Sequence, residues 1–364
     1  MFGDIYRGRR VLVTGHTGFK GSWLVSWLLE LGAEVAGYAL EAPSDPSHFA
    51  VLGLERRMRH IVGDIRDRGR LAREMADFQP EVVFHLAAQA LVRQSYADPA
   101  STFEVNAIGT LNVLEVARTL PCIRAVVLVT SDKAYRNVEW TWGYRENDAL
   151  GGEDPYSASK ACAENVAYSY IHSFFKPRAG AAAVATARAG NVIGGGDWAA
   201  DRIVPDSVRA WSDGRPVVMR APASTRPWQH VLEPLSGYLL LGAFLMRRQA
   251  HALWESYNFG PDATVNQSVQ VLISALAEGW EGAQWQVDPK GLSGRPEARL
   301  LKLCCDKALT DLAWRPVLTF TETVDFTRSW YCLHRQGHAM AGVTVEQLRS
   351  YAAKAAGRNH AWTA

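Results

Sequence analysis

Short apolar runs alternate with longer stretches of helical periodicity in the first half of the chain. The runs predict strands at 11–14, 34–40, 81–88, 125–131 and 181–189. The stretches between them predict helices at 22–32, 66–78, 99–119 and 157–175. This alternation is typical of a parallel sheet with helices on both faces. We therefore predict an α/β fold built on a doubly wound parallel sheet of six or seven strands, with ligands at the carboxyl ends of the strands.

The pattern loosens after Gly190 into turn-rich sequence, short helices and scattered strands. We interpret this half as a second, smaller α/β lobe that holds a substrate. The predicted domains are residues 1–188, which carry the sheet, and residues 189–364, of which about 230–260 returns to the first domain. The last residues, AAKAAGRNHAWTA, are predicted to form a soft tail.

Composition narrows the classes of partner. The net charge of the 364 residues is +2, which gives no global field that would attract nucleic acid or an anionic membrane. An anionic substrate must therefore be met by local arginines. The five cysteines are odd in number and form no C-x-x-C pair, so neither a disulfide framework nor a metal site is expected. With no signal-peptide core and no apolar segment near the ~18 residues of a membrane span, a cytoplasmic location is expected.

Three glycines follow the first predicted strand with the spacing G-x-x-G-x-x-G. Such a turn brings the backbone close to a diphosphate at the amino end of the next helix, which makes it a dinucleotide site. The spacing resembles that of the extended short-chain dehydrogenases/reductases, whose domain is Rossmann-type. The candidate cofactor contacts in this turn are Gly15, His16, Thr17, Gly18, Phe19, Lys20 and Gly21.

The turn leaves the choice of dinucleotide open. No Asp or Glu ends the second strand, where only Glu41 in YALEA is near, so a carboxylate that would select NAD is not evident. Lys20 is compatible with a 2′-phosphate. The bulk of His16 beside the phosphates predicts a loose fit to NAD and a protein that purifies partly empty of it.

The candidate chemistry lies at two strand ends. Tyr156 and Lys160 are four residues apart, which puts them on one helical face. A cationic lysine there is expected to lower the pKa of the phenol toward neutrality, so that it can accept a hydroxyl proton. Ser131 ends the fourth predicted strand and can bind the same hydroxyl. The adjacent Asp132 and Lys133 are not needed for alcohol oxidation, so they suggest a second acid/base step.

The whole chain resembles the nucleotide-sugar 4,6-dehydratases over residues 8–335. The motifs that carry the resemblance are TSDKAY (130–135), WGYREND (142–148), GGEDPYSASKA (151–161), RAGNVIGGGDWAADRIVPD (188–206) and RPWQHVLEPL (226–235). The related dTDP-glucose enzymes have Asp-Glu where this chain has Asp132-Lys133, a form that resembles the CDP-glucose branch of the family.

The resemblance implies a reaction and roles for residues. Tyr156 would take the C4 hydroxyl proton of a nucleotide hexose, with NAD as a retained cofactor. Asp132 would act as the acid at the C6 hydroxyl and Lys133 as the base at C5, if its amine is neutral. The product would be a 4-keto-6-deoxy sugar for deoxysugar biosynthesis, with CDP-glucose as the expected substrate.

The resemblance also implies further binding residues. For the cofactor they are Asp64, Ile65, Leu86, Ala87, Ala88, Gln89 and Asn106. For the nucleotide sugar they are Asn191, Arg202, Arg226 and Arg299.

Other interpretations stay open. A dehydratase of another nucleotide sugar fits the same motifs, and a 4-epimerase or 4-reductase would use Ser131, Tyr156 and Lys160 without the Asp-Lys pair. A non-catalytic NAD-binding regulator is disfavoured because the triad is intact. A homodimer or larger homo-oligomer is expected to form through helices 99–119 and 157–175. Their apolar positions include Leu111, Val113, Leu114, Val116, Val166, Ala167 and Tyr170.

Overall fold

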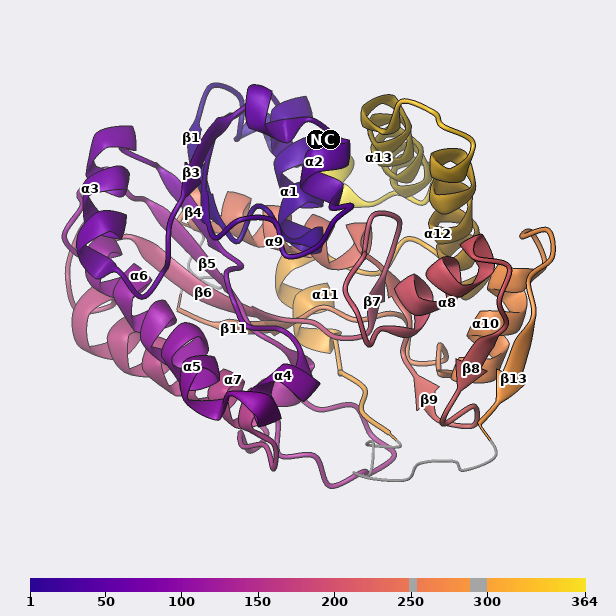
Figure 1. The fold of residues 1–364 in the computed structure, drawn as a ribbon. Helices are drawn as coiled ribbons and strands as arrows, with labels where there is room; N and C mark the ends of the chain where they lie inside the picture. The colour runs from indigo at the N-terminus through magenta and orange to yellow at the C-terminus, as the bar shows by residue number, and fades with distance from the viewer. Residues whose placement is uncertain (249–253, 289–299) are drawn as a thin grey trace.

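A seven-stranded parallel sheet forms the centre of the molecule (Figure 1). The computed structural model describes residues 1–248, 254–288 and 300–364. The strand order is β11-β6-β5-β4-β1-β2-β3. The strands are β1 (Arg10–Thr14), β2 (Glu34–Ala39), β3 (Arg59–Val62), β4 (Val82–His85), β5 (Ala125–Val129), β6 (Ala183–Arg188) and β11 (Ser256–Asn258). The order reverses between β1 and β4, so the predicted doubly wound sheet is confirmed.

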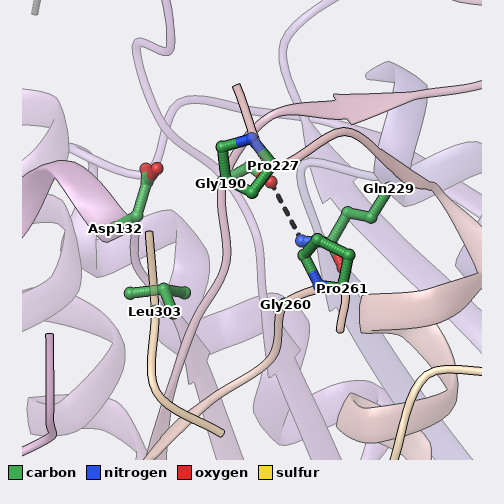
Figure 2. A pocket seen from close by; sticks show the side chains of 7 residues that line it. All are labelled: Asp132, Gly190, Pro227, Gln229, Gly260, Pro261 and Leu303. Carbon is green, nitrogen blue, oxygen red and sulfur yellow. Dashed lines mark hydrogen bonds between the residues drawn. The ribbon is translucent and has the colours of Figure 1, made fainter. Parts of the chain in front are cut away.

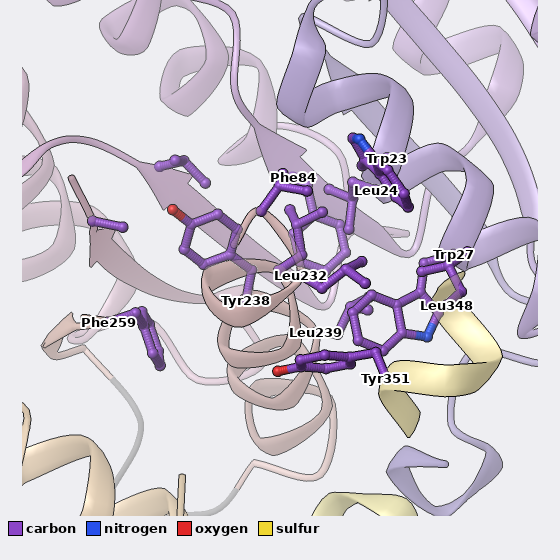
Figure 3. Close-up of a cluster of buried hydrophobic side chains, with 14 of the residues drawn as sticks. Trp23, Leu24, Trp27, Phe84, Leu232, Tyr238, Leu239, Phe259, Leu348 and Tyr351 are labelled. Atoms are coloured by element: carbon purple, nitrogen blue, oxygen red, sulfur yellow. The ribbon is translucent and has the colours of Figure 1, made fainter. Parts of the chain in front are cut away.

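Helices cover both faces of the sheet because alternate side chains of each strand point to opposite sides. In β1, Val11 and Val13 face one core, and Leu12 faces the other. The Leu12 side is covered by α3 (Arg68–Phe78), α6 (Gly109–Ala117) and α7 (Pro155–Tyr170). The opposite side is covered by α1 (Phe19–Glu30) and α9 (Leu232–Met246). Figure 3 shows this second core, where Trp23 and Trp27 of α1 lie near Leu232 and Leu239 of α9.

Helices α6 and α7 are each joined to a stretch of π-helix. The predicted helix at 99–119 consists of α5 (Pro99–Phe103), the π-helical Glu104–Ile108, and α6. Helix α7 continues into the π-helical Ile171–Phe175.

Two elements from the second half of the chain belong to the sheet layers. Helix α9 is buried along almost its whole length. Strand β11 pairs in parallel with β6 and completes the sheet at one edge. Both elements therefore pack with the first half of the chain.

The remaining elements form a smaller lobe beside the carboxyl ends of the strands (Figure 1). Its helices are α8 (Ile203–Ser212), α10 (Val269–Ala277) and α12 (Phe320–Arg335), whereas α11 (Asp306–Leu312) packs on α9 and β11, and α13 (Met340–Gly357) packs on α1 as well as on α12. Its short strand pairs are β7 (Val192–Ile193) with β10 (Gln229–His230), β8 (Val217–Met219) with β13 (Trp285–Val287), and β9 (Thr225–Arg226) with β12 (Gln267–Ser268). Trp211 and Trp228 are buried here.

The prediction of a soft tail is wrong. Helix α13 runs to Gly357, and the short helix Ala361–Thr363 follows it. Trp362 is buried and its ring stacks on Phe2, with 5.1 Å between ring centroids. The two ends of the chain are therefore packed together.

Candidate active site

The glycine turn after β1 has the geometry of a phosphate cradle. Gly15 has φ +75°, and a Cβ on it would lie 2.6 Å from the backbone nitrogen of Ala87. A Cβ on Gly21 would lie 2.1 Å from the carbonyl oxygen of Gly15. Larger residues at either position would push the turn away from its neighbours. The bare turn at the start of α1 can thus receive a dinucleotide diphosphate.

The loop after β4 is fixed against this turn. The hydroxyl oxygen of Thr14 accepts hydrogen bonds from the backbone nitrogens of Leu86 and Ala87, both at 3.2 Å. The same hydroxyl bonds Nδ1 of His85 at 2.7 Å, and burial lowers the pKa of His85 to about 3, so this ring is neutral. The predicted loop residues Leu86, Ala87, Ala88 and Gln89 therefore lie directly beside the glycine turn.

Asn106 connects that loop to the catalytic helix. Its side chain bonds the backbone nitrogen and carbonyl of Gln89 at 2.9 and 3.0 Å. It also donates to the hydroxyl of Ser159 in α7 at 2.8 Å. Asn106 thus fixes the backbone of Gln89 and connects this end of the loop to α7.

His16 lies elsewhere than expected. Its ring is fully buried and bonds Nδ1 of His60 through Nε2 at 2.7 Å. The ring also contacts Phe49 edge-on and fills the space where Gly37 has no side chain. Burial lowers the pKa of His16 to about 3, so it brings no positive charge. The expectation that its bulk crowds the phosphates is wrong, because the ring packs against β2 and β3.

Lys20 also differs from the prediction. Burial lowers its pKa to about 8, and the charges acting on it are those of Arg202, Asp132, Lys160 and Asp197. These groups belong to the catalytic centre, whereas a 2′-phosphate would lie at the end of β2. Lys20 therefore faces the reacting side of the site.

The two residues predicted at the adenine end have structural contacts. The carboxylate of Asp64 is held by Arg66, with distances of 2.7–3.1 Å, and Arg66 lowers the pKa of that carboxyl. Ile65 is buried in the core on the α3 side, where it contacts Gly109. Any contact of Ile65 with a cofactor would therefore use its backbone.

The segment after β5 carries three of the predicted catalytic residues in one turn. Ser131 caps the short helix Asp132–Ala134 and accepts a hydrogen bond from the backbone nitrogen of Lys133 at 3.2 Å. The Ser131 hydroxyl donates to Oδ1 of Asp132 at 3.0 Å. The Asp132 carboxylate is buried, with Nζ of Lys133 at 4.0 Å from it. The Lys133 side chain is 35% exposed, so desolvation of its amine is only partial.

Tyr156 and Lys160 both lie in the first turns of α7, which Asp154 caps. Burial raises the pKa of Tyr156, and a hydrogen bond with Ser131 offsets part of that rise. Burial lowers the pKa of Lys160 to about 8, and Glu164 opposes this. The predicted lowering of the phenol pKa is therefore not present in the protein alone, because removing the phenolate from water outweighs its favourable contacts.

The carboxylate of Asp132 is closely surrounded. Nδ2 of Asn191 donates to its Oδ2 at 3.4 Å. Asn191 itself has a left-handed backbone, with φ 53°. The predicted substrate residue Asn191 is thus directly beside the predicted acid.

Of the two predicted substrate arginines that the structure describes, Arg202 lies in the catalytic centre. Its Nη1 pairs with the buried carboxylate of Asp197 at 3.0 Å. Asp197 raises the pKa of Arg202, and Tyr156 contributes in the same direction. Arg226 lies in β9, where its Nη1 donates to the carbonyl of Thr225 at 2.8 Å. Arg299 lies outside the described residues.

A small cavity opens next to Asp132 (Figure 2). Gln229 donates to the carbonyls of Gly190 and Phe259 at 2.9 and 3.0 Å and so closes one side of it. The lining residues are Asp132, Gly190, Pro227, Gln229, Gly260, Pro261 and Leu303. The two halves of the chain thus meet at the predicted acid.

Known proteins are similar to this chain. The family model described as GDP-mannose 4,6 dehydratase matches residues 12–327. The chain belongs to this family. A CDP-glucose 4,6-dehydratase from Salmonella typhimurium is 46% identical over 352 residues, which cover 96% of this chain and 97% of the relative.

More distant members of the 4,6-dehydratase family agree with the fold. A dTDP-glucose 4,6-dehydratase from Streptomyces griseus is 29% identical and covers 89% of this chain and 94% of its own length. The structure of a dTDP-glucose 4,6-dehydratase from Streptomyces venezuelae, solved with NAD bound, superposes with a TM-score of 0.73 at 27% identity. That match covers 90% of this chain and 98% of the other.

Two residues near these strand ends were not predicted as site residues. Asp197, which holds Arg202, and Gln229, which lines the cavity, both lie in motifs quoted for the resemblance. In the sequence each is only a polar residue in a turn-rich stretch, and such a residue does not indicate that its side chain is buried. Within residues 1–248, 254–288 and 300–364, no cluster of side chains suits a metal ion, and no helix is long and apolar enough to cross a membrane.

Proposed function

We propose that this protein is an NAD-dependent CDP-glucose 4,6-dehydratase, a hydro-lyase. It would convert CDP-glucose to CDP-4-keto-6-deoxyglucose and water. The observation that carries the proposal is the buried Asp132 beside Lys133 in the same turn as Ser131. Oxidation or epimerisation at C4 needs only Ser131, Tyr156 and Lys160, so the additional acid/base pair favours elimination. The 46% identity to a CDP-glucose 4,6-dehydratase supports the choice of nucleotide.

The fit of NAD rests on the glycine turn. At Gly15 and Gly21 a Cβ would meet neighbouring backbone, so the glycines keep the turn tight at the start of α1, where a diphosphate would bind. Leu86–Gln89 would line the nicotinamide ribose. When bound, NAD supplies a reversible hydride acceptor, so the sugar is oxidised and reduced again without net redox change. The relatives solved with NAD bound support this cofactor.

Different residues of the chain would carry out the separate proton transfers. Tyr156 would accept the C4 hydroxyl proton while Ser131 orients that hydroxyl. Because burial raises the pKa of Tyr156, the positive charge of Lys160 is needed close by to stabilise the phenolate. With one proton shifted from the Lys133 ammonium to the Asp132 carboxylate, protonated Asp132 would give its proton to the departing C6 hydroxyl, and the neutral amine of Lys133 would accept the C5 proton.

The nucleotide diphosphate would be met by arginine. Arg202 is oriented by Asp197 and lies near Tyr156, and its planar guanidinium suits bidentate binding of phosphate oxygens. Asn191 would position the sugar against Asp132. Arg226 and Arg299 remain proposed as additional substrate contacts.

We propose the following organisation for the chain. Residues 1–188 form the NAD-binding domain, and residues 189–364 mainly hold the nucleotide sugar, with α9 and β11 returning to the sheet. The protein acts as a homodimer or larger homo-oligomer. A cytoplasmic location is supported by the five cysteines, all of which are free thiols.

The test is a mass measurement on the product. The purified protein is incubated with NAD and, separately, with CDP-, dTDP-, GDP- and UDP-glucose. A dehydratase removes one water from its substrate, whereas a 4-epimerase leaves the mass unchanged. The proposal fails if CDP-glucose keeps its mass, and a faster reaction with another nucleotide would correct the substrate. In Asp132→Asn, reduced nicotinamide should accumulate because C4 oxidation proceeds without water loss.

A further inference from the structure

A buried ion pair lies beneath the catalytic segment. Glu164 of α7 and Arg188 at the end of β6 have side chains that are 2% and 3% exposed. Nε and Nη2 of Arg188 donate to the two carboxylate oxygens of Glu164, each at 2.8 Å. Burial alone would raise the pKa of Glu164, but Arg188 holds it below its ordinary value, so the carboxyl is ionised.

This pair contacts both ends of the segment that carries Ser131, Asp132 and Lys133. At one end, the hydroxyl of Thr130 donates to Glu164. At the other end, Nη1 of Arg188 donates to the hydroxyl of Tyr135 at 2.6 Å, and the guanidinium lies 4.8 Å from the centre of the Tyr135 ring. The hydroxyl of Tyr135 in turn donates to Asn258 of β11 at 2.8 Å. The segment is thus fixed at the residues just before and just after its catalytic turn.

The same carboxylate faces Lys160, one helical turn earlier in α7. Burial lowers the pKa of Lys160, and the charge of Glu164 opposes that effect. The other titratable groups that interact with Lys160 are His85 of β4 and Lys20 of α1. Burial lowers the pKa of His85 to about 3, so it is neutral, and Lys20 carries charge of the same sign as Lys160. Glu164 is therefore the group that favours the cationic form of Lys160.

We propose that Glu164 and Arg188 are positioning residues for the reaction. They hold Ser131, Asp132 and Lys133 in register with Tyr156, and Glu164 keeps Lys160 positively charged. The effect on turnover rests on the proposed function, but the effect on Lys160 is a property of the protein alone.

Two hydroxyls that bind the same carboxylate give a matched pair of variants. Thr130 adjoins Ser131, whereas Thr186 of β6 bonds Oε2 of Glu164 at 3.0 Å without touching the catalytic segment. Both are buried, and Thr→Val replaces each hydroxyl with a methyl group. In Thr186→Val the hydrogen bond to Ser256 is lost as well. Thr130→Val should lower kcat roughly tenfold with little change in KM, because a small misplacement of catalytic groups slows chemistry. Thr186→Val should lower the melting temperature similarly but leave kcat within about twofold. Equal kcat values in the two variants would overturn the positioning role.

The charge on Lys160 is measured without substrate. Trace acetylation with acetic anhydride across a pH series, followed by peptide mass spectrometry, gives the pH at which Lys160 becomes reactive. Exposed Lys176 serves as internal reference. In Glu164→Gln the midpoint for Lys160 should fall by roughly one pH unit relative to wild type, because a neighbouring carboxylate is lost. An unchanged midpoint would overturn this part of the proposal.

A second variant distinguishes the loss of the Glu164 charge from a loss of folding. Glu164→Gln leaves Arg188 buried without its partner, whereas the double variant Glu164→Gln/Arg188→Met removes both charges and keeps the volume. The double variant should show the same downward shift at Lys160. If wild type fails to dehydrate CDP-glucose, the proposed function is wrong, and the acetylation result still decides whether Glu164 sets the charge on Lys160.

Discussion

A Cβ on Gly190 would lie 1.9 Å from Oδ2 of Asp132. The carboxylate therefore occupies the space that a side chain at position 190 would need. Gly190 also presents its carbonyl to Gln229, which fixes the backbone on the other side of the cavity. The position of the predicted acid thus depends on the absence of a side chain in the segment that follows the neighbouring strand, β6.

We expect Gly190→Ala to lower kcat about a hundredfold, because a displacement of Asp132 by about an ångström misplaces the proton for the C6 hydroxyl. Steady-state kinetics with CDP-glucose measure the loss. Gly342→Ala in α13 is the matched control, since a Cβ there meets nothing within 4 Å. If Gly190→Ala retains wild-type kcat, the close approach of these residues has no role in the reaction.

Tyr156→Phe should reduce turnover by about 10²–10⁴-fold, the usual contribution of a positioned general base. Binding of the nucleotide sugar, measured by calorimetry, should change little because only the phenolic oxygen is removed. Ser131 loses one hydrogen-bonding partner in this variant, so its circular dichroism spectrum and melting temperature serve as controls. Activity equal to that of wild type would remove Tyr156 from the mechanism.

The local parts of the site could be predicted because spacing along the chain decides them. Tyr156 and Lys160 share a helix face because they are four residues apart in one helix. Ser131–Lys133 come soon after the end of β5 in the sequence. Five of the seven strands were predictable for the same reason, since they are continuous apolar runs, whereas β3 begins with Arg59 and His60 and was not predicted. Each of these inferences needs only neighbours in sequence.

Contacts between distant segments could not be predicted. The His16 ring fills the space beside Gly37 and bonds His60, which requires knowing how β1, β2 and β3 are packed. The tail appeared soft because its composition is polar and small, yet Trp362 stacks on Phe2 at the other end of the chain. Strand β11 has only three residues, so its sequence alone does not predict a strand. Its pairing with β6 identifies it.

The predicted interface helices are retained, but the interface residues predicted on them need correction. Val113, Leu114, Val116 and Ala167 are buried in the core of the same chain, so they were wrongly assigned to an interface. The exposed apolar side chains on these helices are Ile108, Tyr168 and Phe174, which are 49%, 66% and 43% exposed.

We expect light scattering to give at least a dimer at micromolar concentration, and Ile108→Lys/Tyr168→Lys to give a monomer. The two added charges would be buried against each other across a twofold interface. Trp142→Lys is the control, because Trp142 is 70% exposed in a loop away from these helices. A monomeric wild type, or a double variant with unchanged mass, would contradict the prediction.

Glu233 connects three parts of the second core through its buried carboxyl. It accepts hydrogen bonds from the backbone nitrogens of Val317 and Leu318 and from the hydroxyl of Tyr351 in α13. Burial raises its pKa from 4.5 to about 7, and these hydrogen bonds oppose the rise. The folded protein therefore binds a proton here that the unfolded chain has already lost at neutral pH.

This proton makes stability depend on pH in a defined direction. The stabilisation from protonated Glu233 is complete below about pH 4.5 and is lost as the pH rises through about 7. The loss amounts to about 3 kcal/mol in the free energy of unfolding. The Glu233→Gln variant cannot ionise at this position. As the pH rises from about 4.5 to about 7, its free energy of unfolding should therefore increase relative to that of wild type by about 3 kcal/mol. Urea unfolding at a series of pH values measures the difference, with exposed Glu346→Gln of α13 as the control. A difference between Glu233→Gln and wild type that stays constant with pH would show that Glu233 titrates normally in the folded protein.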